Sequence, residues 1–182
     1  MGKYIALLRG INVGGKNKVS MAILKEAFEQ DGFKDVSTYI NSGNVIFSAN
    51  DENESELKRR CESIIKNAFD LDIIVSIISD KDLSAALANA PDWWDADAES
   101  KHNAVFVIPP VTVHEIIEQA GLTKPQCEQV GFHGQVIFWS APIKTFSRTR
   151  LSKFVSTNLY SNITVRNANT TKKLLQLIGT TT

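Results

Sequence analysis

The sequence predicts an α+β fold made of two tandem ferredoxin-like (βαββαβ) α/β sandwich subdomains with antiparallel sheets. Strand-like and helix-like apolar patterns follow one another in the order βαββαβ, and the same order returns after residue 102. Turn sequences between neighbouring strands predict antiparallel hairpins. The repeat spans roughly 90 residues, within the usual size of a small domain. We interpret it as an internal duplication of element order, with little residue identity between the halves.

The first half, residues 1–90, contains the elements of one sandwich. Ser20 is a typical N-cap for its first helix, and Gly32 marks the end of that helix. A second helix presents apolar residues from Leu57 to Phe69 on one face, and we expect Asp80 to cap a third, shorter helix. Four apolar runs have the length and composition of strands: residues 4–11, 36–40, 44–48 and 73–79.

Residues 91–102 interrupt this pattern and are predicted to form an acidic linker that contains Trp93 and Trp94. Indole rings could stack on a nucleic-acid base, but large aromatic residues in a linker are more typical of packing between two halves of a chain. We therefore interpret both tryptophans as packing residues.

The second half, residues 103–182, repeats the order of the first. Thr112 and Glu115 have the spacing of a capping box at the start of a helix. A further helix carries apolar residues from Leu151 to Leu159, and Asn169 leads into the last helix. Four runs are predicted strands: residues 103–108, 126–132, 135–139 and 163–166.

The formal net charge is zero, but the charges are unevenly distributed along the chain. Residues 51–99 are rich in acids, whereas every charged residue from Lys144 onward is a cation. Such blocks usually solvate helix faces, and a cationic surface that attracts phosphates is the alternative.

The composition excludes several classes of protein. Cys61 and Cys127 lie far apart and neither belongs to a CxxC pair, so the sequence predicts no zinc site, redox motif or disulfide framework. We find no signal peptide, and the longest apolar stretch, residues 73–78, is too short to cross a bilayer. We expect a cytoplasmic protein with no membrane partner, metal or cofactor.

The most informative motif joins the first strand to the first helix. No side chain shields the backbone amides of its glycines, and cationic residues surround these amides. Such a loop favours binding of an anion, above all a phosphate. The alternative is a solvated connection whose glycines only satisfy turn geometry. The candidate ligand-binding residues of this loop are Arg9, Gly10, Asn12, Gly14, Gly15, Lys16, Asn17 and Lys18.

The expected topology adds a second loop to this site. In a ferredoxin-like sheet the first two strands run in the same direction, so the loops that follow them emerge at the same edge. The turn after the second strand contains Ser42, Gly43 and Asn44, and we expect it to lie beside the glycine-rich loop.

Residues 10–16 also match the first seven positions of the P-loop, G-x-x-x-x-G-K, but Asn17 stands where a hydroxyl should hold magnesium. The P-loop fold needs a parallel sheet, whereas the turn at residues 41–44 predicts an antiparallel hairpin. The helix also begins near Ser20, too far along the chain for its dipole to act at Lys16. We therefore reject a nucleotide hydrolase.

A second polar cluster, Arg166, Asn167 and Asn169, lies at the end of the last strand. These side chains could hydrogen-bond a ligand, but Asn169 is an equally good N-cap. No catalytic residue is predicted, because the histidines lack the spacing of a metal site or a triad.

Six stretches carry a family resemblance: residues 4–19, 38–47, 91–94, 101–106, 152–154 and 164–167. On these motifs the chain resembles a bacterial family catalogued as domain of unknown function 1697. The resemblance implies two ferredoxin-like subdomains and supplies no activity. The chain has Ser20 where the family usually has Pro, and Ala168 where it usually has Trp. The missing Trp at Ala168 weakens the hypothesis of a ligand at the C-terminal cluster.

Three functions remain open at this point. The first is binding of a phosphate-bearing or other anionic small molecule at the glycine-rich loop, with or without catalysis. The second is a nucleic-acid-binding module, which would need exposed aromatic residues such as Tyr4, Tyr39 and Phe47 on its strands. The third is a protein-interaction module without a small ligand, acting through the acidic middle or the basic C-terminal part.

Overall fold

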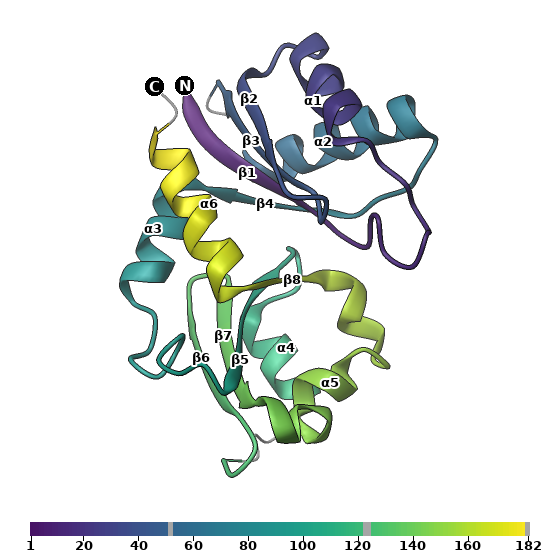
Figure 1. The fold of residues 1–182 in the computed structure, drawn as a ribbon. Helices are drawn as coiled ribbons and strands as arrows, with labels where there is room; N and C mark the ends of the chain where they lie inside the picture. Colours follow the sequence, from purple (N-terminus) through teal and green to yellow (C-terminus); the bar gives the residue numbers. More distant parts are fainter. Residues whose placement is uncertain (51–52, 122–124, 181–182) are drawn as a thin grey trace. The chain divides into compact units, whose positions relative to one another are not determined.

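The computed structural model describes residues 1–50, 53–121 and 125–180 (Figure 1). Asp51 and Glu52 of the acidic segment lie outside the described residues. The first half contains β1 (Gly2–Leu8), α1 (Met21–Gln30), β2 (Lys34–Tyr39), β3 (Asn44–Ala49), α2 (Glu54–Phe69), β4 (Val75–Ser79) and α3 (Asp80–Ala88). The second half contains β5 (Ser100–Val107), α4 (Val113–Ala120), β6 (Gln129–His133), β7 (Val136–Pro142), α5 (Arg150–Phe154), β8 (Ile163–Asn167) and α6 (Ala168–Thr180), with 3₁₀ helices η1 (Ile143–Arg148) and η2 (Asn158–Asn162).

The described strands form two four-stranded sheets in the orders β2-β3-β1-β4 and β6-β7-β5-β8. Neighbouring strands are antiparallel throughout both sheets. The first strand of each half therefore lies between the third and the fourth, as the ferredoxin-like fold requires. The predicted α+β fold with two such halves is confirmed.

Two compact units divide the chain. The N-terminal unit comprises Met1–Leu83 and the segment from Leu174, and the C-terminal unit comprises Ser84–Lys173. The division passes through α3 and α6, and Lys3 Nζ donates to the carbonyl of Ile178 at 3.4 Å within the N-terminal unit. The subdomain limits predicted from the sequence, residues 1–90 and 103–182, therefore remain a prediction.

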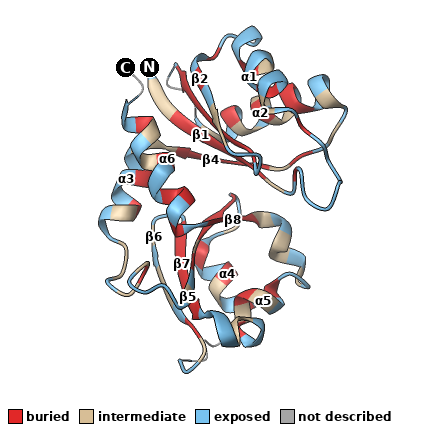
Figure 2. Cartoon of the chain, in the orientation of Figure 1, coloured by how far each residue is buried: buried red, intermediate tan, exposed pale blue. Residues whose placement is uncertain are grey.

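One face of the first sheet packs against α1 and α2 (Figure 1). Phe28, Phe33 and Phe47 meet in this core, with 4.4 Å between the ring centroids of Phe33 and Phe47. Ile5 and Leu7 alternate with the helix-facing residues of β1 and are also buried, as the buried colour along β1 in Figure 2 shows. A strand buried on both faces has no polar alternation, which explains the continuous apolar run in the sequence.

The second sheet packs its corresponding face against α4 and α5. Thr112 and Glu115 form the predicted capping box, because each side chain accepts from the backbone amide of the other. The single helix predicted through Leu159 is wrong, since α5 ends at Phe154 and η2 follows. The hydroxyl of Thr157 donates to the Phe154 carbonyl at 2.8 Å, and such side-chain bonds compete with continuation of a helix.

Two helix starts also differ from the prediction by one or two residues. Asp80 is the first residue of α3, and the cap is Ser79, whose hydroxyl oxygen accepts from the Asp82 amide at 3.1 Å. Likewise α6 begins before Asn169, and Asn167 Oδ1 accepts from the Thr170 amide at 2.8 Å. Each helix thus uses the Ser or Asn residue directly before its first turn.

Trp94 is a packing residue, but its contacts with Asn103 and Phe138 lie within the C-terminal unit, and packing between the two halves stays a prediction. Its indole nitrogen donates to the Asn103 carbonyl at 2.9 Å, and its ring lies edge-on to Phe138. None of the described helices combines the length and the apolar character needed to span a bilayer.

Glu54, the first residue of α2, yields a prediction about stability. Desolvation by burial, followed by repulsion from Asp82, raises the pKa of Glu54 above its ordinary value of 4.5. A carboxyl whose pKa is higher in the folded state destabilises that state once it ionises. We therefore expect Glu54→Gln to increase the free energy of unfolding at pH 7 and to lose this advantage below pH 4.5.

Urea denaturation between pH 3.5 and 8 measures this effect. Glu56→Gln is the matched control, because Glu56 occupies the same first turn and is exposed. A stabilisation by Glu54→Gln that does not depend on pH would contradict the electrostatic explanation.

Candidate functional site

The candidate ligand-binding residues lie in two places. Residues 9–18 and 40–44 belong to the N-terminal unit and are called the rim here. Arg166, Asn167 and Asn169 belong to the C-terminal unit. The rim forms as the topology predicts, because β1 and β2 both pair with β3, and Asn44 is the register partner of both Leu7 and Tyr39.

The glycine-rich segment closes on itself as a small β-hairpin. The Lys16 amide donates to the Val13 carbonyl at 3.0 Å, and the Asn12 amide donates to the Asn17 carbonyl at 3.1 Å. Gly14 and Gly15 form the tip with φ values of 57° and 77°, and positive φ at both central residues is what a type I′ turn requires. The amides of these two glycines have no hydrogen-bond partner within the described residues.

Asn12 ties this hairpin to the rest of the rim. Its Oδ1 accepts from the Val19 amide at 2.9 Å, and its Nδ2 donates to the Val19 carbonyl at 3.0 Å and to the Asn41 carbonyl at 2.9 Å. Its backbone is left-handed, with φ of 53°, a conformation that Asn tolerates better than most residues. The Asn12 carboxamide is therefore a structural brace between the two loops.

The turn after β2 is fixed by equally specific contacts. The Gly43 carbonyl accepts from the Leu8 amide at 2.8 Å, and a Cβ at Gly43 would lie 2.6 Å from Ile11 Cδ1. Asn44 is fully buried, and its Nδ2 donates to the Tyr39 carbonyl at 2.8 Å and to Ser42 Oγ at 3.3 Å. Like Asn17, whose Nδ2 donates to the Gly10 carbonyl at 3.0 Å, Asn44 shapes its loop from within.

The side chains of two rim cations have no partner within the described residues, a property that they share with the exposed Lys34, Arg59 and Lys81 of the same unit. Lys16 and Lys18 are exposed, and neither side chain makes an ion pair or hydrogen bond within the described residues. By contrast, three lysines on helices face a carboxylate within 4 Å: Lys25 with Glu29, Lys58 with Glu62, and Lys66 with Asp70 and Asp72. The uncompensated positive charge of the hairpin is therefore available to an external anion.

Ile40 stands out as strained and exposed. It has φ of 51°, a left-handed conformation that is a genuine outlier for a β-branched residue, and 46 % of its surface is exposed. Val13 on the hairpin is 67 % exposed. The rim thus presents apolar surface together with its lysines, and strained residues of this kind cluster at functional sites in other proteins.

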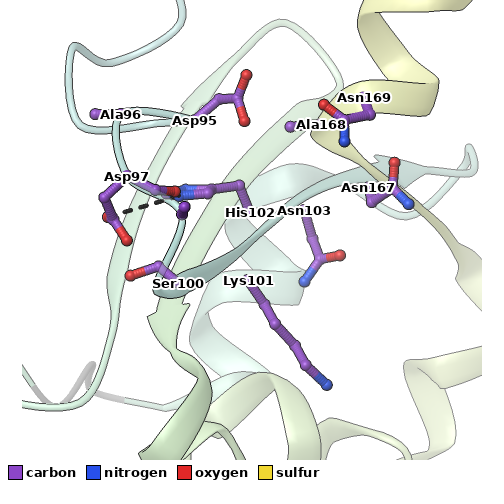
Figure 3. Close-up of a pocket in the computed structure, with 11 residues that line it drawn as sticks. Asp95, Ala96, Asp97, Ser100, Lys101, His102, Asn103, Asn167, Ala168 and Asn169 are labelled. Atoms are coloured by element: carbon purple, nitrogen blue, oxygen red, sulfur yellow. Dashed lines mark hydrogen bonds and ion pairs between the residues drawn. The ribbon is translucent and has the colours of Figure 1, made fainter.

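An open cleft of about 740 Å³ lies in the C-terminal unit where β8 passes into α6. Figure 3 shows Asn103 on β5, Asn167 and Asn169 at the β8–α6 junction, and the loop from Asp95 to Ser100 across from them. Asn103 and Asn167 are register partners on neighbouring strands, so their side chains leave the same face of the sheet. We call this the asparagine cleft.

His102 also lines the cleft, but both ring nitrogens are occupied. Nε2 lies 2.9 Å from the Asp97 carbonyl, which can only accept, so Nε2 carries the proton. Nδ1 lies 2.7 Å from the hydroxyl oxygen of the buried Ser140. The Asp97 carboxylate lies 3.6 Å from Nε2. A hydrogen bond with the Ser100 side chain is the main cause that lowers the pKa of Asp97.

Arg166 is separated from the asparagines of its motif. Successive residues of a strand point to opposite faces, so Arg166 lies on the other face of the sheet from Asn167. Arg166 is buried, donates from Nη1 to Thr164 Oγ1 at 3.2 Å and to the Val165 carbonyl at 2.9 Å, and burial lowers its pKa to about 10. The guanidinium therefore stays charged at neutral pH.

The structure brings in residues that sequence reasoning missed. Asn103, Lys101 and the acidic loop line the cleft, although the sequence placed no site in the linker or at the start of β5. Lys101 and Asn103 belong to one of the stretches that carry the family resemblance, but that motif assigns no site to them. Only the pairing of β5 with β8, which follows from the topology, could have directed attention to Asn103 as the partner of Asn167.

Asn12 gives a prediction about the rim. Asn12→Ala removes three hydrogen bonds and puts into the left-handed conformation a residue that tolerates it less well than Asn, so we expect a loss of about 3 kcal/mol of stability. Asn12→Gly loses the same bonds without the backbone strain and should cost about 1 kcal/mol less. Chemical denaturation measures both values, and amide exchange should accelerate at Val19, whose amide donates to Asn12. Equal losses for the two variants would refute the role of the positive φ.

Ile40 gives a prediction of opposite sign. Ile40→Asn should raise the free energy of unfolding by about 1 kcal/mol, because Asn adopts the left-handed conformation with less strain and replaces an exposed apolar side chain. Ile23, which is 51 % exposed and lies in α1, provides the control. Ile23→Asn should not stabilise the protein, since Asn has no helix propensity advantage over Ile. Destabilisation by Ile40→Asn would contradict this prediction. It would show that contacts of the Ile40 side chain stabilise the fold by more than its backbone strain destabilises it.

Comparison with known proteins agrees with the fold and identifies the family. A solved structure, described as that of a conserved bacterial protein from Streptococcus pneumoniae, has a TM-score of 0.85 and 32% sequence identity to this chain. The similarity covers 97% of this chain and 98% of that one. No match was found among curated proteins. Residues 1–138 match the family described as protein of unknown function DUF1697, and the chain therefore belongs to this family.

Proposed function

We propose that the rim binds a phosphate-bearing or other anionic small molecule. The observation that carries this proposal is the pair of exposed lysines, Lys16 and Lys18, which have no partner within the described residues and lie on a loop braced by Asn12. A ligand would meet these ammonium groups without first displacing an internal carboxylate. The free amides of Gly14 and Gly15 add donors at the tip of the hairpin.

The closed hairpin changes the expected form of the site. The sequence suggested a cradle of bare amides, whereas two of the loop amides donate to carbonyls of the loop itself. Charge on side chains, rather than a ring of backbone donors, therefore supplies the attraction. Exposed contacts of this kind are screened by salt, so binding should weaken as ionic strength rises.

The apolar surface of the rim favours a ligand that is more than an inorganic ion. Val13 and Ile40 expose β-branched side chains beside the cationic segment. A nucleotide or another phosphate with an attached apolar or aromatic group could contact both surfaces. A protein partner is the second candidate, since the same exposed residues suit an acidic protein surface.

A nucleic-acid module of the sheet-stacking kind is disfavoured. Tyr4 and Phe47 are buried against α1 and α2, with their rings stacked on each other at 5.9 Å. The rings of Tyr4 and Phe47 are therefore not available to stacked bases, which leaves only the half-exposed Tyr39 of the three aromatic residues considered above.

Isothermal titration with ATP, glucose 6-phosphate and pyrophosphate tests the proposal. We expect saturable binding by at least one of them, which the double variant Lys16→Ala, Lys18→Ala weakens about tenfold or more, because two charge-assisted hydrogen bonds are lost. Lys25→Ala is the matched control, since Lys25 is exposed but faces Glu29. Absence of binding by all three anions, or binding that the double variant leaves unchanged, would overturn the proposal.

A further inference from the structure

We propose that the asparagine cleft is a second binding site, which takes a neutral ligand with vicinal hydroxyl groups. The proposal concerns the C-terminal unit and is independent of the anion site on the rim. It rests on two observations. Carboxamide groups line the cleft without hydrogen-bond partners within the described residues, and the charged side chains of the cleft already have contacts of their own.

The unused groups are carboxamides. The side chains of Asn103 and Asn169 make no hydrogen bond within the described residues. Asn167 uses Oδ1 to cap α6, which leaves its Nδ2 as a donor. A carboxamide offers two donors and an acceptor in one plane, and a hydroxyl group both donates and accepts. Two adjacent hydroxyls could therefore engage neighbouring carboxamides.

The charged residues around the cleft argue for a neutral ligand. Asp95 forms an ion pair with Lys172, and Asp97 accepts from the Glu99 amide at 2.9 Å. The Lys101 ammonium lies 4.4 Å from the ring centroid of Phe146. Asp95 is thus paired with an opposite charge, Asp97 and Lys101 each have a neutral contact, and a charged ligand would have to compete with these contacts.

The dimensions of the cleft are those of a small-molecule site and leave room for a sugar ring. The cleft volume of about 740 Å³ lies within the range of small-molecule sites, about 300–1,000 Å³. A vicinal diol occurs in free monosaccharides and in ribonucleosides, so both kinds of ligand share the chemistry. The test therefore includes D-glucose, D-ribose and adenosine.

Titration of the ¹⁵N-labelled full chain, followed by NMR, reads the site directly. Side-chain amide signals of Asn103 and Asn169 should shift in a saturable way with a diol-bearing probe. Asn103→Ala and Asn169→Ala should each weaken binding by about 2- to 10-fold, the value of one neutral hydrogen bond. A deoxy analogue of the probe that binds should have its affinity reduced by a similar factor. Unchanged melting temperatures verify folding, because the Asn103 contact to Trp94 is through the backbone carbonyl and is retained.

The outcomes separate this proposal from the anion site. Lys16→Ala with Lys18→Ala should leave the titration at the cleft unchanged. No saturable shift with any of the three probes, or binding that both asparagine variants leave unaffected, would overturn the proposal. Stronger binding of glucose 6-phosphate than of glucose, weakened by Asn103→Ala, would also overturn it, because the cleft would then prefer an anion.

Discussion

The pairing of β3 with both β1 and β2 is the constraint on which the N-terminal unit depends. Asn44, at the start of β3, lies opposite the end of β1 and the end of β2 at once. The chain therefore leaves both strands at one edge of the sheet, and loops distant in sequence become neighbours. Asn12 then fixes their distance through a hydrogen bond to the Asn41 carbonyl. The rim is thus a product of strand order first and of loop sequence second.

The same strand order in the C-terminal unit does not produce the same site. The rim lies where β1 ends, whereas the asparagine cleft lies where β5 begins and β8 ends, at the opposite edge of an equivalent sheet. The segment between β1 and α1 is long enough for a hairpin, but only residues 108–112 separate β5 from α4. The two halves therefore repeat a scaffold while carrying different candidate sites.

Sequence patterns predicted the scaffold because its signals are local and repeated. Turn residues such as Gly43 and capping residues such as Thr112 mark the ends of elements, and apolar runs mark the buried strands. The site was harder to predict, since one side chain type can serve two purposes. Asn12 and Asn44 were predicted ligand contacts, yet their carboxamides brace the backbone. Asn103 lies beside Asn167 only because β5 pairs with β8. Such roles depend on tertiary contacts that no short window contains.

A balanced net charge conceals the feature that distinguishes the two candidate sites. The decisive quantity is whether a charged side chain already has a partner, since an exposed, unpaired ammonium is available to a ligand and a paired one is not. Lys16 belongs to the first class, whereas Lys172, held by Asp95, belongs to the second. The rim should therefore select for negative charge, while the cleft should select for the geometry of hydrogen bonds. One scaffold can in this way carry sites for ligands of different charge without any difference in fold.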